Sequence, residues 1–249
     1  MSKIYGPCSE KQKMILENDA DILVIGGAAG SGKSFLLQLM PLKIIDDPHS
    51  SVVMFRRTTP QLEGEGGLWP KAVAIYSDLP ENIKPKFREK DHKFIFPRFD
   101  PNTGKWDRSK KGAVVKYCHM EYVQDKLNHQ GLEYTMVCFD EGTQFEWEQI
   151  DYLMSRLRSQ SKYPSRMVIS CNPDSEHMLA KLVRWWLDDE GYPDPEKCGK
   201  KRYFIRRDGE FIWGDSKEEL IEKYTTVNGL GVEIKPRPLS FSFIGATIK

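Results

Sequence analysis

An eight-residue glycine-rich segment is the first feature of this 249-residue sequence that could do chemistry. The segment satisfies the pattern G-x-x-x-x-G-K-[ST] and consists of Gly27, Ala28, Ala29, Gly30, Ser31, Gly32, Lys33 and Ser34. Glycines let backbone N–H groups surround an anionic oxygen, the lysine can bridge β- and γ-phosphates, and the serine hydroxyl can bind Mg²⁺. An apolar run at 22–25 precedes the segment and a helix-forming run at 35–40 follows it. This strand-loop-helix order favours an ATP-binding loop over a plain glycine-rich turn.

Two adjacent carboxylates end a second apolar run. Asp140 and Glu141 follow 136–139, which we interpret as a buried strand. Asp140 has the position of a residue that binds Mg²⁺, directly or through water, and Glu141 that of the base that orients and deprotonates an attacking water. A strand that runs into a polar turn is the alternative. Together with the phosphate-binding loop, the pair predicts ATP hydrolysis rather than binding alone.

A third apolar run, 167–170, leads into small polar residues. Ser170, Cys171 and Asn172 precede a proline, and an Asn-Pro turn would by itself explain them. In a parallel sheet the same residues would lie beside the γ-phosphate, where Ser170 or Asn172 could report hydrolysis to the rest of the protein. We therefore assign Ser170, Cys171 and Asn172 as candidate coupling residues.

The elements that must position these residues alternate between strands and helices. Apolar bursts, including one at 52–55, alternate with helical stretches, which predicts an α/β fold with a parallel central sheet flanked by helices. We expect an ATPase core at 1–175 and a small lid subdomain at 176–238. The lid should contain a helix at 178–190, a hairpin (201–205 and 211–213) and a helix at 216–224. A final strand within 239–249 should return to the core.

Composition excludes several classes of protein. Charged residues make up 29% of the chain and no apolar run approaches the roughly 20 residues that cross a membrane. The five cysteines are scattered without a C-x-x-C pair, so they predict neither a disulfide framework nor a zinc site, and a reducing cytosol is the default compartment. The net charge of +1 gives no overall argument for nucleic acid.

Charge is nevertheless uneven along the chain. Residues 84–116 carry 11 basic and 4 acidic side chains, and residues 117–175 carry 5 and 9. The basic block predicts a hairpin insertion spanning 84–117, with strands at 93–96 and 113–117 and a turn at 100–105. Either the hairpin is a solvated ribbon or it contacts DNA phosphates. The candidate DNA-binding residues are Lys105, Arg108, Lys110 and Lys111.

Taken together, these motifs resemble the ATPase domain of the large terminase subunits of tailed bacteriophages. The resemblance covers nearly the whole chain and rests on motifs in a fixed order: Gln12, the loop Gly27–Ser34, Phe55-Arg56-Arg57, Gln130 to Tyr134 before Asp140-Glu141, the segment Tyr152 to Ser159, and Ser170 to Pro173. It implies a P-loop NTPase fold of the additional-strand catalytic-glutamate type. It also implies that Gln12 reads adenine and that Arg56 and Asn172 contact the nucleotide.

The resemblance further implies a motor that packages double-stranded DNA into a procapsid in the host cytoplasm. Its partners would be the portal protein, the terminase small subunit and further copies of the chain. The copies would form a ring, expected to be a pentamer, on the portal. In isolation the chain could be a monomer. An arginine from a neighbouring copy would complete each ATP site. We expect Arg156 or Arg158, placed on a helix, with Arg56 and Arg57 as second candidates. Ion pairs of these arginines with Glu146, Glu148 or Asp151 are the alternative.

Relatives of this kind continue into an RNase H-like nuclease domain, and the chain ends before one, so no nuclease activity is expected from it. Two other functions remain open at this point. One is a P-loop protein that binds ATP as a scaffold without translocating DNA. The other is a helicase-like ATPase, which is disfavoured because we find no series of aromatic residues for stacking single-stranded bases.

Overall fold

The computed structural model describes residues 5–27, 30–172 and 174–246. The helices in this part are α1 (Glu10–Glu17), α2 (Lys33–Leu39), α3 (Thr59–Glu63), α4 (Leu68–Ser77), α5 (Trp147–Met154), α6 (Met178–Val183) and α7 (Lys217–Tyr224). Short 3₁₀ helices are η1 (Met40–Lys43), η2 (Glu89–Asp91), η3 (Val123–His129), η4 (Gly142–Gln144) and η5 (Arg184–Trp186).

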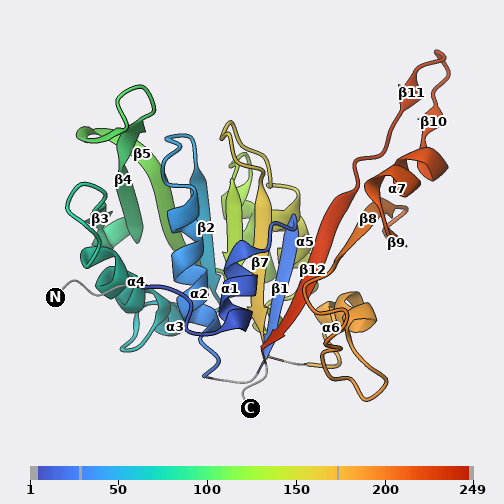
Figure 1. Ribbon diagram of the computed structural model, residues 1–249, viewed down its shortest axis with the longest axis horizontal. Coiled ribbons are helices and arrows are strands. Elements are labelled where there is room, and N and C mark those ends of the chain that lie inside the picture. Colours follow the sequence, from blue (N-terminus) through green and yellow to red (C-terminus); the bar gives the residue numbers. More distant parts are fainter. Residues whose placement is uncertain (1–4, 28–29, 173, 247–249) are drawn as a thin grey trace.

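The strands of the same residues are β1 (Ile22–Gly27), β2 (Ser51–Arg56), β3 (Lys86–Arg88), β4 (Lys93–Asp100), β5 (Lys105–His119), β6 (Met136–Phe139), β7 (Arg166–Cys171), β8 (Lys201–Arg207), β9 (Glu210–Gly214), β10 (Thr226–Val227), β11 (Glu233–Ile234) and β12 (Leu239–Ala246). Ten of them form one sheet in the order β3-β4-β5-β2-β6-β7-β1-β12-β8-β9 (Figure 1). The strands from β5 to β12 in this order run parallel, and an antiparallel hairpin extends each end.

Both faces of the parallel strands are buried, which explains why they are continuous apolar runs. Along β1, Leu23 and Ile25 join the hydrophobic cluster under α1, α2 and α4, whereas Ile22 and Val24 join the cluster under α5 and α6. Alternate residues of a strand point to opposite faces of its sheet, so consecutive residues of β1 are buried in the two clusters in turn. Figure 1 shows α1, α2 and α4 in front of the sheet. The α/β fold with a parallel central sheet is confirmed.

Register brings the ends of β1, β6 and β7 to one edge. Gly26 pairs with Cys171, and Phe139 pairs with Ile169, so the loops that leave these three strands emerge side by side. Ligands of open α/β sheets bind at this carboxyl edge. The sheet thus positions the glycine-rich loop next to Asp140 and Glu141.

The two predicted hairpins are both present. β4 and β5 are longer than the expected strands, and their turn lies between Asp100 and Lys105 as predicted. β8 and β9 pair with β12 in the main sheet, so the residues expected to form a lid share that sheet with the core. The predicted helix at 178–190 is wrong in length, because α6 ends at Val183 and η5 at Trp186. Trp186 turns into the core there, and its indole N–H donates to the carbonyl of Lys200 at 2.9 Å.

Candidate nucleotide-binding site

The glycine-rich loop has the backbone that a phosphate-binding loop needs. Gly30 and Gly32 have φ values of 84° and 78°, in the left-handed region that glycine adopts without a steric cost. A Cβ atom on Gly32 would lie 2.8 Å from Nε2 of Gln12, so the glycine also leaves room for that side chain. The side chain of Gln12 therefore lies against the loop, and its expected role in reading adenine stays a prediction. Ala28 and Ala29 lie outside the described residues.

Lys33 begins α2 and is almost completely buried at 5% exposure. Its ammonium donates to the carbonyl of Gly27 at 2.6 Å, to Oδ1 of Asn172 at 3.0 Å and to Oγ of Ser31 at 3.4 Å. The lysine is thus held between the end of β1 and the end of β7. Asn172 is predicted to contact the nucleotide. In the structure its side chain accepts a hydrogen bond from Lys33, the residue expected to bind the phosphates.

Asp140 is the centre of a buried polar cluster with 1% of its surface exposed. Its Oδ1 accepts hydrogen bonds from Oγ of Ser34 at 3.0 Å and Oγ of Ser170 at 2.6 Å. Its Oδ2 lies 2.7 Å from Nη2 of Arg56 at the end of β2. Three strands and the first turn of α2 therefore converge on one carboxylate. The residues fit a magnesium ion, because Mg²⁺ takes one or two protein oxygens and completes its shell with phosphates and water.

Glu141 has a left-handed backbone, with φ 59° and ψ 56°. This conformation is uncommon for a residue with a side chain and marks strain that clusters at functional sites. Its N–H donates to Oγ of Ser170 at 3.2 Å, which ties the turn to β7. Gly142 follows, and a Cβ there would collide with the side chain of Ile169. The turn that aims Glu141 thus depends on glycine at the next position.

Cys171 is buried beside these groups at the end of β7. Burial raises the pKa of its thiol to about 12, against the opposing effect of the nearby Lys33 ammonium. The thiol therefore stays protonated near neutral pH and cannot serve as a nucleophile.

The placement predicted for Arg156 and Arg158 is wrong. Helix α5 ends at Met154, and both arginines lie in the segment after it. Arg156 accepts from the N–H of Tyr134 through its carbonyl, and its guanidinium covers the ring of Tyr152. Tyr134 precedes β6 and Asp140 follows it, so the two residues are six steps apart along the chain. An extended chain covers roughly 20 Å in six steps at about 3.3 Å per residue. Both arginines therefore lie at the opposite edge of the sheet from the chain's own Asp140.

The acidic residues of α5 form ion pairs with residues other than Arg156 and Arg158. Glu148 pairs with Lys126, and Asp151 pairs with Arg206 of β8. The ion pairs of Arg156 and Arg158 with these acids, given above as the alternative, are absent among the described residues. Arg57 turns away from Asp140, and its Nη1 donates to Oε1 of Gln149 at 2.7 Å.

Gln149 is a residue that the sequence interpretation missed. It is fully buried, and its amide also donates to the carbonyls of Met120 and Tyr122. The available signal was the capping box at the start of α5, in which the N–H of Glu146 donates to Gln149 at 2.9 Å. Gln149 joins α5 to the segments that follow β2 and β5.

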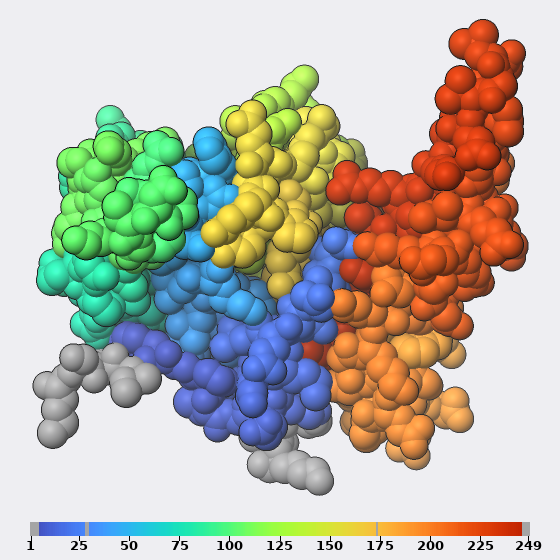
Figure 2. Space-filling view, turned by 45° about the horizontal axis from the view of Figure 1, so that its top comes forward, coloured from blue at the N-terminus to red at the C-terminus, as the bar shows by residue number. Residues whose placement is uncertain are grey.

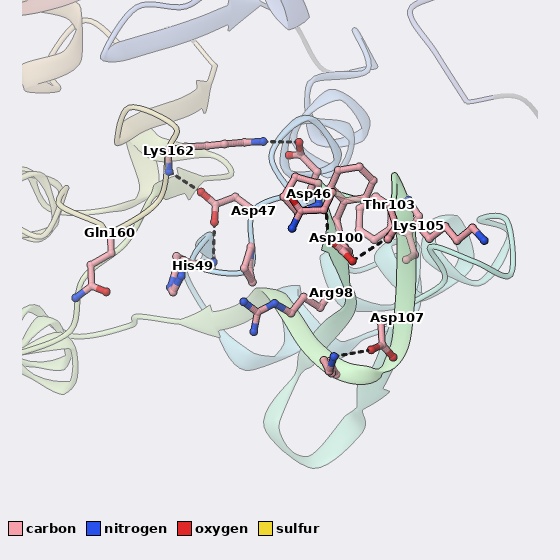
Figure 3. A pocket seen from close by; sticks show the side chains of 16 residues that line it. Asp46, Asp47, His49, Arg98, Asp100, Thr103, Lys105, Asp107, Gln160 and Lys162 are labelled. Carbon is pink, nitrogen blue, oxygen red and sulfur yellow. Dashed lines mark hydrogen bonds and ion pairs between the residues drawn. The ribbon is translucent and has the colours of Figure 1, made fainter.

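The four candidate DNA-binding residues fall into two groups. Arg108 pairs with Glu81, and Lys110 pairs with Asp107 at 3.2 Å. Lys105 and Lys111 have no side-chain hydrogen bond or ion pair within the part of the chain that the structure describes. Figure 3 shows Lys105, with Arg98, beside a groove of about 990 Å³ between the hairpin tip and the loops at 46–49 and 160–162.

The comparisons with known proteins agree with this geometry. A family described as the terminase large subunit, T4likevirus-type, N-terminal, matches residues 24–234. The chain belongs to this family. The resemblance stated from the motifs is thereby confirmed. No curated protein matches the sequence.

Solved terminase structures share the fold of this family member. The large terminase ATPase domain of Thermus phage P74-26 aligns with a TM-score of 0.56 at 14% identity, covering 77% of this chain and 79% of that one. The large terminase of a thermophilic bacteriophage, in complex with ADP, aligns with a TM-score of 0.50 at 15% identity over 67% of this chain. That of bacteriophage HK97 has a TM-score of 0.52 at 15% identity over 72% of this chain. The chain spans 39% of the terminase in complex with ADP and 36% of the HK97 protein.

Within the described residues, no helix combines the length and apolar character needed to cross a membrane.

Proposed function

We propose that this chain is the ATP-hydrolysing motor domain of a terminase large subunit that drives double-stranded DNA into a procapsid in the host cytoplasm. One observation carries the proposal: Lys33, Ser34 and Asp140 meet at the carboxyl edge of the sheet, with Glu141 on the adjoining turn. Family membership and the ADP complex of the thermophilic bacteriophage terminase support the same conclusion.

The residues divide the work of hydrolysis. Backbone N–H groups of the glycine-rich loop and the Lys33 ammonium bind the phosphates. Gln12, whose amide donates to the carbonyl of Ser31 in that loop at 3.5 Å, recognises the base. Ser34 and Asp140 would hold Mg²⁺, which neutralises charge that develops on the phosphates. Glu141 orients the attacking water and takes its proton.

The contact between Lys33 and Asn172 suggests how hydrolysis is reported. The Lys33 ammonium donates to Oδ1 of Asn172 at 3.0 Å. Phosphate oxygens compete for the same ammonium protons, so binding and hydrolysis alternately release and restore the contact with the end of β7. Ser170, Cys171 and Asn172 then act together as the coupling segment, and residues 176–238 act as the lid.

The assembled motor would be a ring, a pentamer in our proposal, on the portal protein with the terminase small subunit delivering DNA. Arg156 and Arg158 lie roughly 20 Å from the chain's own Asp140, so either would act only in the site of a neighbouring copy. Arg56 contacts the chain's own Asp140 and is thereby suited to act within one copy.

Steady-state hydrolysis and nucleotide binding test the proposal together. Glu141→Gln should lower the rate of ATP hydrolysis by about 10²- to 10⁴-fold and leave ATP affinity intact. Lys33→Ala should abolish binding. Glu148→Gln, which changes a surface carboxylate on α5, is the matched control and should behave as wild type. A wild-type rate for Glu141→Gln would show that Glu141 is not the base. Tight ATP binding by the wild-type chain without hydrolysis would indicate a nucleotide-binding scaffold instead.

A further inference from the structure

Residues 225–238 form an arm that projects from the body of the molecule. β10 and β11 pair antiparallel within it, and Figure 1 and Figure 2 show it extending past α7 beyond the β8–β9 end of the sheet. Four apolar side chains of the arm are each more than half exposed: Val227, Leu230, Val232 and Ile234. Leu230, near the tip, is 87% exposed. Apolar side chains gathered on a projecting element indicate a contact surface.

A second exposed apolar surface lies on the segment 121–133, which connects β5 to β6. Tyr122, Leu127 and Leu132 are each more than two fifths exposed there. β5 and β6 lie in the interior of the strand order, whereas the arm extends beyond the β8–β9 end. The two surfaces therefore belong to different parts of one molecule.

Charge on the two surfaces is complementary. Within the arm, Glu233 is balanced by Lys235 at 3.5 Å, whereas Arg237 forms no ion pair with a described residue. Next to the arm, Glu222 and Lys223 of α7 carry opposite charges, so Arg237 leaves the arm with a net positive charge. The segment 121–133 contains one lysine, Lys126, which forms an ion pair with Glu148 of α5. The acids Glu121, Asp125 and Glu133 remain there without an ion pair among the described residues. Opposite charges around apolar centres favour a specific pairing of surfaces.

We propose that the arm of one copy docks on the 121–133 surface of a neighbouring copy. This inference rests on the ring assembly in the proposed function and names the surfaces that would form it. Because the two surfaces differ, the contact is heterologous, and head-to-tail repetition closes into a ring where the rotation permits. The docked segment leads into β6, and Asp140 and Glu141 follow the end of that strand at Phe139. Docking would thus touch the segment that carries the catalytic strand of the neighbour.

A mixing experiment tests both surfaces on the full chain. One variant carries Leu230→Glu and Val232→Glu in the arm, and the other carries Tyr122→Lys and Leu127→Lys on the 121–133 surface. Sedimentation velocity at increasing protein concentration should show self-association of wild type and a weakening of roughly tenfold or more in each variant. All four positions are exposed, so circular dichroism should be unchanged. Tyr192→Glu alters an exposed apolar side chain outside both surfaces and serves as control.

The equimolar mixture gives the decisive result. The intact arm of the second variant can dock on the intact surface of the first, so the mixture should form dimers and stop there. A wild-type chain that stays monomeric at every concentration would overturn the inference, as would an arm variant that associates like wild type. A mixture without dimers would overturn the pairing of these two surfaces. ATP binding in the same samples reports on the proposed function separately, because neither variant alters the residues of the nucleotide site.

Discussion

Nη2 of Arg56 lies 2.7 Å from Oδ2 of Asp140, so a neighbouring strand supplies the charge that balances the buried carboxylate. Asp140 is 1% exposed, and the Arg56 side chain is 16% exposed. The carboxylate that would hold magnesium thus already has a cationic partner. A magnesium ion bound to Asp140 would add a second positive charge beside the Arg56 guanidinium.

Removing Arg56 should therefore leave a buried carboxylate without its partner. Arg56→Ala should lower the free energy of unfolding by about 3 kcal/mol, because breaking a buried pair strands the remaining charge. Added Mg²⁺ should restore more stability to the variant than to wild type. Urea denaturation with and without Mg²⁺ measures both effects.

Arg57→Ala is the matched control for this pair. Its guanidinium hydrogen-bonds the neutral Gln149, so the expected loss is only about 1–2 kcal/mol, and Mg²⁺ should not restore it. Equal losses in the two variants, with no difference in the response to Mg²⁺, would contradict the role given to Arg56.

The left-handed backbone of Glu141 predicts a conflict between stability and activity. Glu141→Gly should raise the free energy of unfolding by about 0.5–1 kcal/mol, because glycine adopts a φ of 59° without the steric cost. The same change removes the proposed base, so hydrolysis should slow by about 10²- to 10⁴-fold. Glu141→Gln keeps the strain and loses only the base. Thermal unfolding of the two variants separates these effects, and a less stable Glu141→Gly would show that the backbone is not strained.

The grouping of these side chains at one edge of the sheet was predictable from the sequence because it is encoded locally. The glycine-rich loop, Asp140 and Glu141 each follow an apolar run whose length and burial mark a strand, and parallel strands bring their carboxyl ends together. The interpretation of Arg56 as a residue of this site also agrees with its contact to Asp140.

What the sequence could not reveal depends on long-range packing. The segment Tyr152 to Ser159 suggested a continuing helix, but the N–H of Tyr134 bonds the carbonyl of Arg156 and the backbone leaves α5 after Met154. Trp186 ends the helical stretch after α6 because its indole reaches Lys200, 14 residues away. Propensity along the chain carries no information on such partners.

The buried ring of His129 should make the protein less stable as the pH falls. Its Nδ1 lies 2.7 Å from the hydroxyl of Tyr134, and burial, assisted by the charge of Lys116, lowers its pKa from 6.5 to about 4. The unfolded chain therefore takes up a proton before the folded one does, so this contribution is complete above pH 6.5 and is lost as the pH falls to about 4. Its size is on the order of 2 kcal/mol after allowance for solvent screening.

Denaturation at a series of pH values tests this prediction. The slope of the unfolding free energy between pH 6.5 and about 4 should be smaller for His129→Gln than for wild type. An unchanged slope in His129→Gln would assign the acid sensitivity to other groups.

The basic hairpin makes a graded prediction for DNA binding. Lys105 and Lys111 have no ion pair among the described residues, whereas Arg108 and Lys110 are paired with Glu81 and Asp107. If the hairpin contacts DNA phosphates, each unpaired lysine releases about one counterion on binding, which contributes roughly 0.9 to the slope of log affinity against log salt. Lys105→Ala with Lys111→Ala should thus flatten the slope by nearly 2 on this basis.

Arg108→Ala with Lys110→Ala is the matched comparison, because it removes the same formal charge from the same hairpin. These two side chains already have acidic partners, so less charge is free to meet phosphate and the slope should change less. Duplex affinity measured over a salt series with two unrelated sequences distinguishes the cases. Loss of a phosphate contact should weaken binding equally for the two sequences, because such contacts carry no sequence information. A slope that neither double variant changes would mean that the hairpin is a solvated ribbon.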